Sequence, residues 1–403
     1  MVLLTPSPTD VVYVGVAVAA GTRHERDDES GMAHLVEHMT FKGTRHRSSL
    51  QVLNHMESVG GDLNAYTGKE ETIYYCTCMR QHLRRAIGLL MDIVFDSTYP
   101  QHELEKEVEV VVDEIESYND SPADLIYDDF EALLFPHQPL GRSILGSAER
   151  LRQYHSEDVR DFAQRTYTFA HAVLFVKGNV SMKEIKASLP VLSIREEGRP
   201  SACDKEATCQ PLPSLMGEVA GGSSVTLSKG THQAHVMIGS RAYAATDPRY
   251  MGLFLLNNIL GGPAMNSRLS LALRERAGLV YTVESNCTAY TDTGTWTTYF
   301  GCDSEDVARC LRIVKRELRR ITEQPLPPRT LAAAKRQLKG QLGIASDHFE
   351  NEALGMAKYF LHYHHVPSLE ERYQLVDALT AEDLQTIARE IFDPLRLTTL
   401  IYK

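Results

Sequence analysis

The chain has 403 residues, of which 43% are hydrophobic and 24% are charged, as expected for a globular protein of two or more domains. Its 42 basic and 53 acidic residues leave a net charge of −11, and no run of five or six consecutive basic residues occurs. This balance excludes the usual signature of a nucleic-acid-binding protein, so we expect no nucleic-acid partner.

The seven cysteines are odd in number and form no C-x-x-C pair, which indicates neither a thiolate zinc site nor a complete disulfide framework. A reducing compartment fits this usage best. The apolar stretch 11–20 has no basic residue before it, which favours a half-buried strand over a signal peptide. No apolar run reaches the ~18 residues of a membrane-spanning helix, so we expect a cytoplasmic protein without a membrane partner.

The hydrophobic pattern of the first half predicts a mixture of strands and helices, with Ser30 and Gly43 as caps of the first helix. Residues 191–223 lose all periodicity, which is typical of a linker. The predicted elements are strands over 11–19 and 172–180, a strand pair over 62–79, and helices over 30–42, 49–59, 81–95 and 101–118.

The same order of elements returns after the linker, which indicates an internal duplication. We therefore predict an α+β fold of two homologous domains, 1–190 and 224–403, each a mixed, mostly antiparallel sheet with helices packed on it. Only the first copy keeps the histidines of this motif, because "FLLNN" at 254–258 stands where the first copy has "HLVEH". The elements predicted here are a strand over 226–243, helices over 250–262 and 267–278, a strand pair over 279–302 and a closing strand over 395–403.

The stretch "GMAHLVEHMTFKGT" at 31–44 places His34 and His38 four residues apart, so on a helix both imidazoles share one face, with Glu37 beside them. Two imidazoles and a carboxylate can hold Zn²⁺, and a further carboxylate can accept a proton from an attacking water. Such a pentapeptide also arises by chance, so a third ligand is needed to support the metal site.

The helix predicted over 101–118 supplies two candidates for this ligand. Glu107 and Glu114 are seven residues apart and therefore lie two turns apart on one face. An acidic helix is usually just a solvated surface, and the spacing alone does not choose between the two glutamates.

The H-x-x-E-H order is typical of inverzincins. The chain resembles the zinc peptidase family that includes pitrilysin, insulin-degrading enzyme and the mitochondrial processing peptidase, most closely its two-domain bacterial members. Nearly the whole chain is covered by five blocks in family order: "GMAHLVEHMTFKGT", "GGDLNAYTGKEETIYY", "EKEVEVVVDEI", "PLGRSILG" and "SRLSLALRERAGLVYTVES".

The resemblance implies one zinc ion per chain, bound by His34, His38 and Glu114, with Glu37 as the general base. Glu107 corresponds to a second glutamate of this helix that lies near the metal without being the main ligand. The domain 1–190 would then be catalytic, and the second domain would have a different task.

The resemblance also assigns substrate-binding residues in both halves. Asn64 and Ala65 match a strand segment that pairs with an extended substrate backbone, although a plain strand and turn explains them equally well. Arg274 and Tyr281 match a pair that holds substrate and stabilises the oxyanion. On composition alone they would be a surface arginine and a core tyrosine.

The implied reaction is peptide-bond hydrolysis, in which Zn²⁺ polarises the carbonyl and Glu37 passes a proton from water to the leaving amine. Two chains are expected to form a clam-like chamber for peptides or unfolded segments. One chain holds both the zinc motif and the Arg274–Tyr281 pair, so a homodimer is a simpler expectation than a heterodimer with a paralogue. Each pair could complete the partner's active site.

Two other functions compete with this interpretation: a non-catalytic partner subunit of a peptidase complex, and a hydrolase of a non-peptide substrate. Intact zinc-motif residues argue against the first, and the strand-binding block argues against the second. Gly68 stands where many relatives carry serine. Cys203 and Cys209 have no role that we can assign, although they could form a bridge under oxidation.

Overall fold

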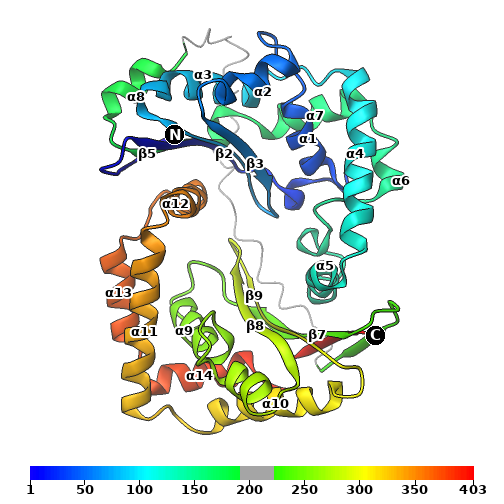
Figure 1. The fold of residues 1–403 in the computed structure, drawn as a ribbon, viewed down its shortest axis with the longest axis vertical. Helices are drawn as coiled ribbons and strands as arrows, with labels where there is room; N and C mark the ends of the chain where they lie inside the picture. Colours follow the sequence, from blue (N-terminus) through cyan, green and yellow to red (C-terminus); the bar gives the residue numbers. More distant parts are fainter. Residues whose placement is uncertain (191–221) are drawn as a thin grey trace, which may run out of the picture. The chain divides into compact units, whose positions relative to one another are not determined.

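The computed structural model describes residues 1–190 and 222–403, which form two compact units (Figure 1). The first unit contains residues 1–117, 137–190 and 345–366, and the second contains residues 118–136, 222–344 and 367–403. The predicted linker, with Cys203 and Cys209, lies almost entirely outside the described residues. No helix in the described part of the chain combines the length and apolar character needed to cross a membrane.

The first unit is built on a five-stranded sheet with the order β1-β5-β2-β4-β3. β1 and β5 are parallel, and the other pairs are antiparallel. β3 is at the edge of the sheet and pairs only with β4. The core of this unit joins the valines of β2 to the apolar faces of the helices. The strands are β1 (Val2–Pro6), β2 (Val11–Val18), β3 (Asp62–Thr67), β4 (Thr72–Met79) and β5 (Ala172–Gly178).

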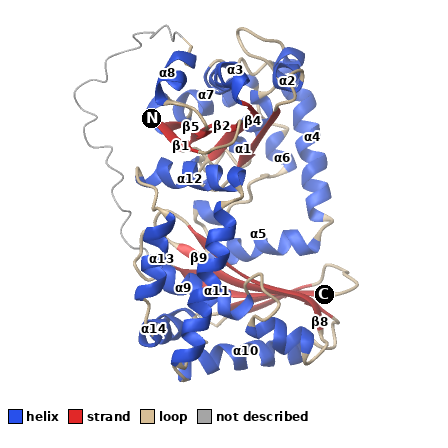
Figure 2. Ribbon diagram, turned by 60° about the vertical axis from the view of Figure 1, so that its left-hand side comes forward, coloured by secondary structure: helices blue, strands red, loops and turns tan. Residues whose placement is uncertain are grey.

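The helices of the first half follow the predicted pattern closely (Figure 2). A capping box of Ser48 and Gln51 begins α2, in which each side chain bonds the other residue's backbone N–H. The longer helices are α1 (Met32–Thr40), α2 (Ser49–Glu57), α3 (Leu83–Phe95), α4 (Gln101–Asn119), α5 (Pro122–Leu134) and α7 (Ser156–Thr166), and the shorter ones are α6 (Ala148–Leu151) and α8 (Met182–Ser188).

The second unit repeats this topology with the sheet order β6-β10-β7-β9-β8. β6 is parallel to β10 and the remaining pairs are antiparallel, as in the first sheet. The predicted fold class of two domains, each a mixed sheet with packed helices, is confirmed. The strands are β6 (Ser224–Leu227), β7 (Ala234–Ala242), β8 (Val280–Ala289), β9 (Gly294–Cys302) and β10 (Thr398–Tyr402).

Two predicted elements of the second half differ from the structure. The strand expected over 226–243 is two strands, β6 and β7, because a turn with Gly230 at a φ of +64° separates them. The helix expected over 267–278 is the short π-helix η5 (Ser270–Glu275). The other helices are α9 (Tyr250–Gly261), α10 (Val307–Glu323), α11 (Pro328–Ser346), α12 (Phe349–Tyr363), α13 (Leu369–Ala378) and α14 (Ala381–Ile391).

Each unit contains one helix from the other half of the sequence. α5, from the first half, packs on β7 and β10 of the second sheet. α12, from the second half, packs on β2 and β5 of the first sheet (Figure 1). The predicted domain ranges 1–190 and 224–403 do not include this exchange of helices. The exchange is the same in both halves, because α5 comes directly after α4 and α12 comes directly after α11.

Candidate metal centre

The helix α1, which carries both histidines of the motif, begins at Met32, two residues after the start of the predicted range 30–42. Gly31, not Ser30, is the N-cap, and its φ of +81° is a left-handed conformation that suits glycine. The Glu25 carboxylate accepts hydrogen bonds from the backbone N–H groups of Gly31 (3.4 Å) and Ala33 (2.9 Å). The Glu25 side chain, six residues before the N-cap, therefore provides the cap that Ser30 was expected to provide, and burial raises the pKa of Glu25 to about 8.

The other end of α1 also differs from the expectation. Phe41 is the C-cap, and Gly43 lies two residues beyond it at a φ of +125°. Gly43 therefore turns the chain after the helix but does not cap it.

The structure brings together the three predicted metal ligands, His34, His38 and Glu114. Oε2 of Glu114 lies 3.8 Å from Nε2 of His34 and 3.6 Å from Nε2 of His38, and the three ligand atoms lie within 4.8 Å of one another. Zinc bonds of ~2.1 Å in a tetrahedral arrangement would place ligand atoms roughly 3.4 Å apart. The observed separations therefore fit one zinc ion, although the role of these residues as ligands stays a prediction.

The electrostatic state of His34 suits metal binding. Burial and the neighbouring imidazole of His38 lower the pKa of His34 to about 3, so the ring is neutral at physiological pH. Its Nδ1 is buried without a hydrogen-bond partner among the described residues. A neutral imidazole, which has a nitrogen lone pair to donate, is the form that binds a metal.

Glu107 contacts His38 and does not join the ligand atoms. Its Oε1 lies 3.0 Å from Nδ1 of His38, and its Oε2 lies 2.5 Å from the ammonium of Lys42. Burial alone would raise the pKa of Glu107, but these two contacts outweigh it and lower the pKa. For His38, burial alone would lower the pKa, but the Glu107 hydrogen bond and the nearby carboxylates raise it.

The arrangement of Glu107 specifies how His38 would bind a metal. With the Nδ1 proton donated to Glu107, the lone pair of Nε2 is directed toward Glu114. Lys42 was not predicted as a functional residue. Lys42 lies just after the end of α1 and four residues after His38. This spacing could have indicated that Lys42 lies near His38, since side chains four residues apart lie close together.

Glu37 is buried beside this cluster. Its Oε2 accepts a hydrogen bond of 2.6 Å from the hydroxyl of Thr67, the last residue of β3. Burial raises the pKa of Glu37, and the Thr67 hydrogen bond partly offsets that effect. Thr67 was not predicted either, because no spacing rule connects a helix to a strand thirty residues away.

Asn64 and Ala65 lie in the edge strand β3, opposite Tyr75 and Tyr74 of β4. The side-chain amide of Asn64 donates to Asp62 in the same strand at 2.9 Å. An edge strand has backbone groups available for a further strand. Pairing with substrate at these residues stays a prediction.

Arg274 and Tyr281 belong to the second unit. Arg274 is half-exposed in η5, with Nε 3.1 Å from the Glu275 carboxylate. Tyr281 lies in β8, the edge strand of the second sheet, and is 90% exposed, which excludes the alternative of a core tyrosine. Their predicted action at the site of Glu37 stays a prediction.

A second group of possible ligands, His46, Asp92 and Asp96, also lies within 4.8 Å in the described part of the chain. The Asp92 carboxylate is hydrogen-bonded to the guanidinium of Arg47, and Arg45 lies 3.9 Å from Asp96. The two arginines already balance the two carboxylates, so a cation has less to gain here than at the histidine pair.

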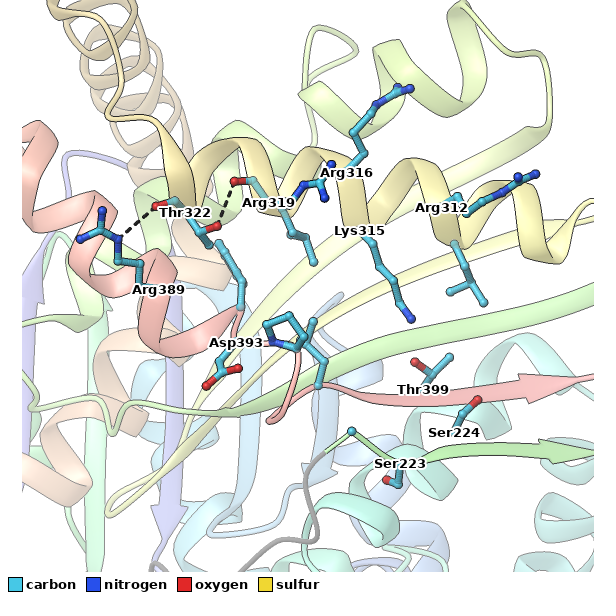
Figure 3. A pocket seen from close by; sticks show the side chains of 16 residues that line it. Ser223, Ser224, Arg312, Lys315, Arg316, Arg319, Thr322, Arg389, Asp393 and Thr399 are labelled. Atoms are coloured by element: carbon cyan, nitrogen blue, oxygen red, sulfur yellow. Dashed lines mark hydrogen bonds between the residues drawn. The ribbon is translucent and has the colours of Figure 1, made fainter.

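A cavity of about 580 Å³ in the second unit is lined by α10, the end of α14, β6 and β10 (Figure 3). The side chain of Lys315 points into the cavity, whereas that of Arg316 points away from it. None of the predicted site residues lines this cavity.

Two protein-family models match the chain. The model described as Insulinase (Peptidase family M16) covers residues 1–148, and the model described as Peptidase M16 inactive domain covers residues 154–338. The chain belongs to the insulinase family of peptidases. The resemblance that the sequence motifs indicated is thereby confirmed.

Relatives of this insulinase-family chain are named zinc proteases. The uncharacterized zinc protease YmxG of Bacillus subtilis is 30% identical over 393 residues, which cover 97% of this chain and 93% of the relative. An uncharacterized zinc protease of Rickettsia felis is 30% identical over 395 residues, which cover 97% and 92%.

Solved structures establish the same fold. A protease from Helicobacter pylori superposes with a TM-score of 0.89 at 21% identity, covering 99% of this chain and 96% of the other. A structure from Pseudomonas fluorescens described as a peptidase M16 inactive domain has a TM-score of 0.84 at 18% identity, covering 100% and 94%.

Proposed function

We propose that the protein is a zinc-dependent metalloendopeptidase that hydrolyses peptides or unfolded segments of proteins. The observation that supports this most strongly is the convergence of His34 Nε2, His38 Nε2 and Glu114 Oε2 on one ion-sized position. The family and the zinc protease names of the relatives agree with it. One zinc ion per chain is expected.

The donor set fits zinc better than a harder cation. Two imidazole nitrogens with one carboxylate are a common catalytic zinc set, which leaves a fourth position open. Magnesium and calcium prefer sites made of oxygen atoms alone. When bound, zinc would supply Lewis-acid polarisation of a peptide carbonyl and would acidify the attacking water.

The residues of the chain have separable tasks in this reaction. The Glu37 carboxylate takes a proton from the attacking water and passes it to the leaving amine. Glu107 holds the ring of His38 in the tautomer that leaves Nε2 available. The edge strand β3 offers backbone N–H and C=O groups to an extended peptide, which favours a peptide over a non-peptide substrate.

The test compares wild-type protein with Glu37→Gln, using a mixed peptide library with product identification by mass spectrometry. The exposed Glu57→Gln on α2 is the matched control. We expect about one zinc per chain in all three proteins, with cleavage abolished by chelation and by Glu37→Gln only. Bound zinc without cleavage by wild-type protein would favour the alternative of a non-catalytic, substrate-holding subunit.

We further propose a homodimer that forms a clam-like chamber, in which Arg274 and Tyr281 of one chain serve the Glu37 site of the other. The family resemblance and the 90% exposure of Tyr281 support it. Mixing Glu37→Gln chains with Tyr281→Phe chains should restore part of the activity. No recovery, after subunit exchange has been demonstrated with isotope-labelled chains, would contradict completion in trans.

A further inference from the structure

The turn between β3 and β4 contains three consecutive charged residues that are nearly fully buried. Lys69 is 7% exposed, Glu70 is 3% exposed and Glu71 is 1% exposed. Burial of a charge is costly unless it is paired and hydrogen-bonded. A hairpin turn on a protein surface usually has solvated polar residues, so this turn has a structural or functional requirement.

Each buried charge is held by a different part of the first unit. Glu71 lies 2.7 Å from the ammonium of Lys358 and 3.2 Å from Nε2 of His362, both on α12. Glu70 forms an ion pair of 2.7 Å with Arg23, and the Lys69 ammonium donates a hydrogen bond to the backbone carbonyl of Arg142. The turn is therefore fixed from three directions.

Thr67 comes directly before this turn and bonds Glu37. The hydroxyl oxygen of Thr67 lies 2.6 Å from Glu37 Oε2 and 3.3 Å from the hydroxyl of Thr72. Thr72 donates its own hydrogen to the backbone carbonyl of Ala20 at 2.8 Å. Thr67 has one hydrogen to donate, and Glu37 Oε2 at 2.6 Å is a much closer acceptor for it than the Thr72 hydroxyl at 3.3 Å.

We propose that Thr67 is a positioning residue for the general base, and that the buried charges of the turn hold Thr67 in place. This inference rests on the proposed function. The bond occupies Oε2 of Glu37 and so assigns the proton transfer to Oε1.

The test uses Thr67→Val, which keeps the shape of the side chain and removes the hydroxyl, and Thr67→Ser, which restores it. Thr77→Val is the matched control, because Thr77 also donates to a carboxylate, Glu350, from the same hairpin. For each protein we would measure kcat, KM, zinc content and melting temperature.

We expect Thr67→Val to lower kcat about 10- to 100-fold with little change in KM, zinc content or melting temperature. Thr67→Ser should recover most of kcat, and Thr77→Val should match wild type. An active wild type with an equally active Thr67→Val, or a Thr67→Ser as impaired as Thr67→Val, would overturn the positioning role. Wild-type protein that cleaves no peptide would instead overturn the proposed function and the inference with it.

Discussion

His38 and Glu107 form a hydrogen bond of 3.0 Å between Nδ1 of the imidazole and Oε1 of the carboxylate. The bond joins α1 to α4, the two helices that carry the candidate zinc ligands. It directs Nε2 of His38 toward Glu114 and leaves Glu107 outside the ligand set. In the proposed zinc site, the two glutamates that the sequence offered as alternatives would have complementary tasks: Glu114 would bind the metal and Glu107 would orient the ring of His38.

We predict that Glu107→Gln weakens zinc binding about 10- to 100-fold, because an amide lacks the charge that stabilises the Nδ1 proton of His38. Chelator competition on purified protein would measure the affinity. Glu109→Gln on the same helix is the matched control, since Glu109 is exposed and pairs with Arg152. Equal zinc affinity of Glu107→Gln and wild type would contradict the assigned role.

Local periodicity determines which side chains share a helix face, so it could place the two histidines together and offer two glutamates, but the choice of Glu114 came from the family resemblance. His34 and His38 are one turn apart, and Glu107 and Glu114 are two turns apart. The contacts of Glu107 with His38 and of Thr67 with Glu37 could not be predicted in this way. They depend on how two elements pack and on the register of β3 with β4, which no spacing within one element specifies.

If His34, His38 and Glu114 bind zinc as proposed, zinc removal should destabilise the protein, because only the folded chain brings these three side chains together. At zinc concentrations a thousand-fold above Kd the contribution is about 4 kcal/mol. This corresponds to a fall in melting temperature on the order of 10 °C for a unit of this size. Calorimetry of zinc-loaded and chelator-treated protein would measure the difference.

The matched variants for zinc stabilisation lie on one helix. Glu114→Gln should lose most of the zinc-dependent rise in melting temperature, whereas Glu116→Gln, also exposed on α4, should keep it. A melting temperature independent of zinc in wild-type protein would show that the cluster does not bind the ion tightly.

Acid should weaken the attachment of α12 through Glu71. Burial alone would raise the pKa of Glu71, but the His362 hydrogen bond and the Lys358 ammonium lower the pKa below the ordinary value of 4.5. A carboxyl whose folded-state pKa is depressed contributes stability that is present above its unfolded pKa. The contribution is lost as the pH falls from about 4.5 through the folded-state pKa.

Melting temperatures between pH 7 and pH 3 would test this linkage. Glu71→Gln should have a lower melting temperature than wild type at pH 7, and this difference in melting temperature should become smaller below about pH 4.5. Glu57→Gln, an exposed residue of α2, should follow wild type throughout. A difference in melting temperature between wild type and Glu71→Gln that stays constant down to pH 3 would mean that the charge of Glu71 does not stabilise the fold.

The helix exchange shows what the pattern of a sequence leaves open. The amphipathic character of α5 and α12 indicates helices, but both sheets have apolar faces that could receive either one. The contacts that attach α12 to the first sheet, such as those of Glu71 with Lys358 and His362, join residues nearly 300 positions apart. The similarity of the two sheets was more accessible, because the order of predicted elements repeats along the chain, but no strand order was predicted.

The close approach of Gly31 and Gly146 should be essential for the start of α1. A Cβ atom on Gly146 would lie 2.6 Å from Cα of Gly31, and the φ of Gly146 is +74°. Gly146→Ala should therefore lower the free energy of unfolding for two reasons. Alanine at this positive φ costs about 1–2 kcal/mol, and the clash of its Cβ with Gly31 adds a steric cost. Gly60 isolates the first cost, because its φ is also +74° and a Cβ there would meet no atom within 4 Å.

Denaturant unfolding of Gly60→Ala and Gly146→Ala would separate the two costs. Gly146→Ala should be the less stable variant and should also bind zinc more weakly, since a shift of Gly31 moves the turn of α1 that carries His34. Gly60→Ala should keep the zinc affinity of wild type. Equal stability of the two variants would mean that the segment around Gly146 moves aside at no cost, and that the start of α1 does not depend on this contact.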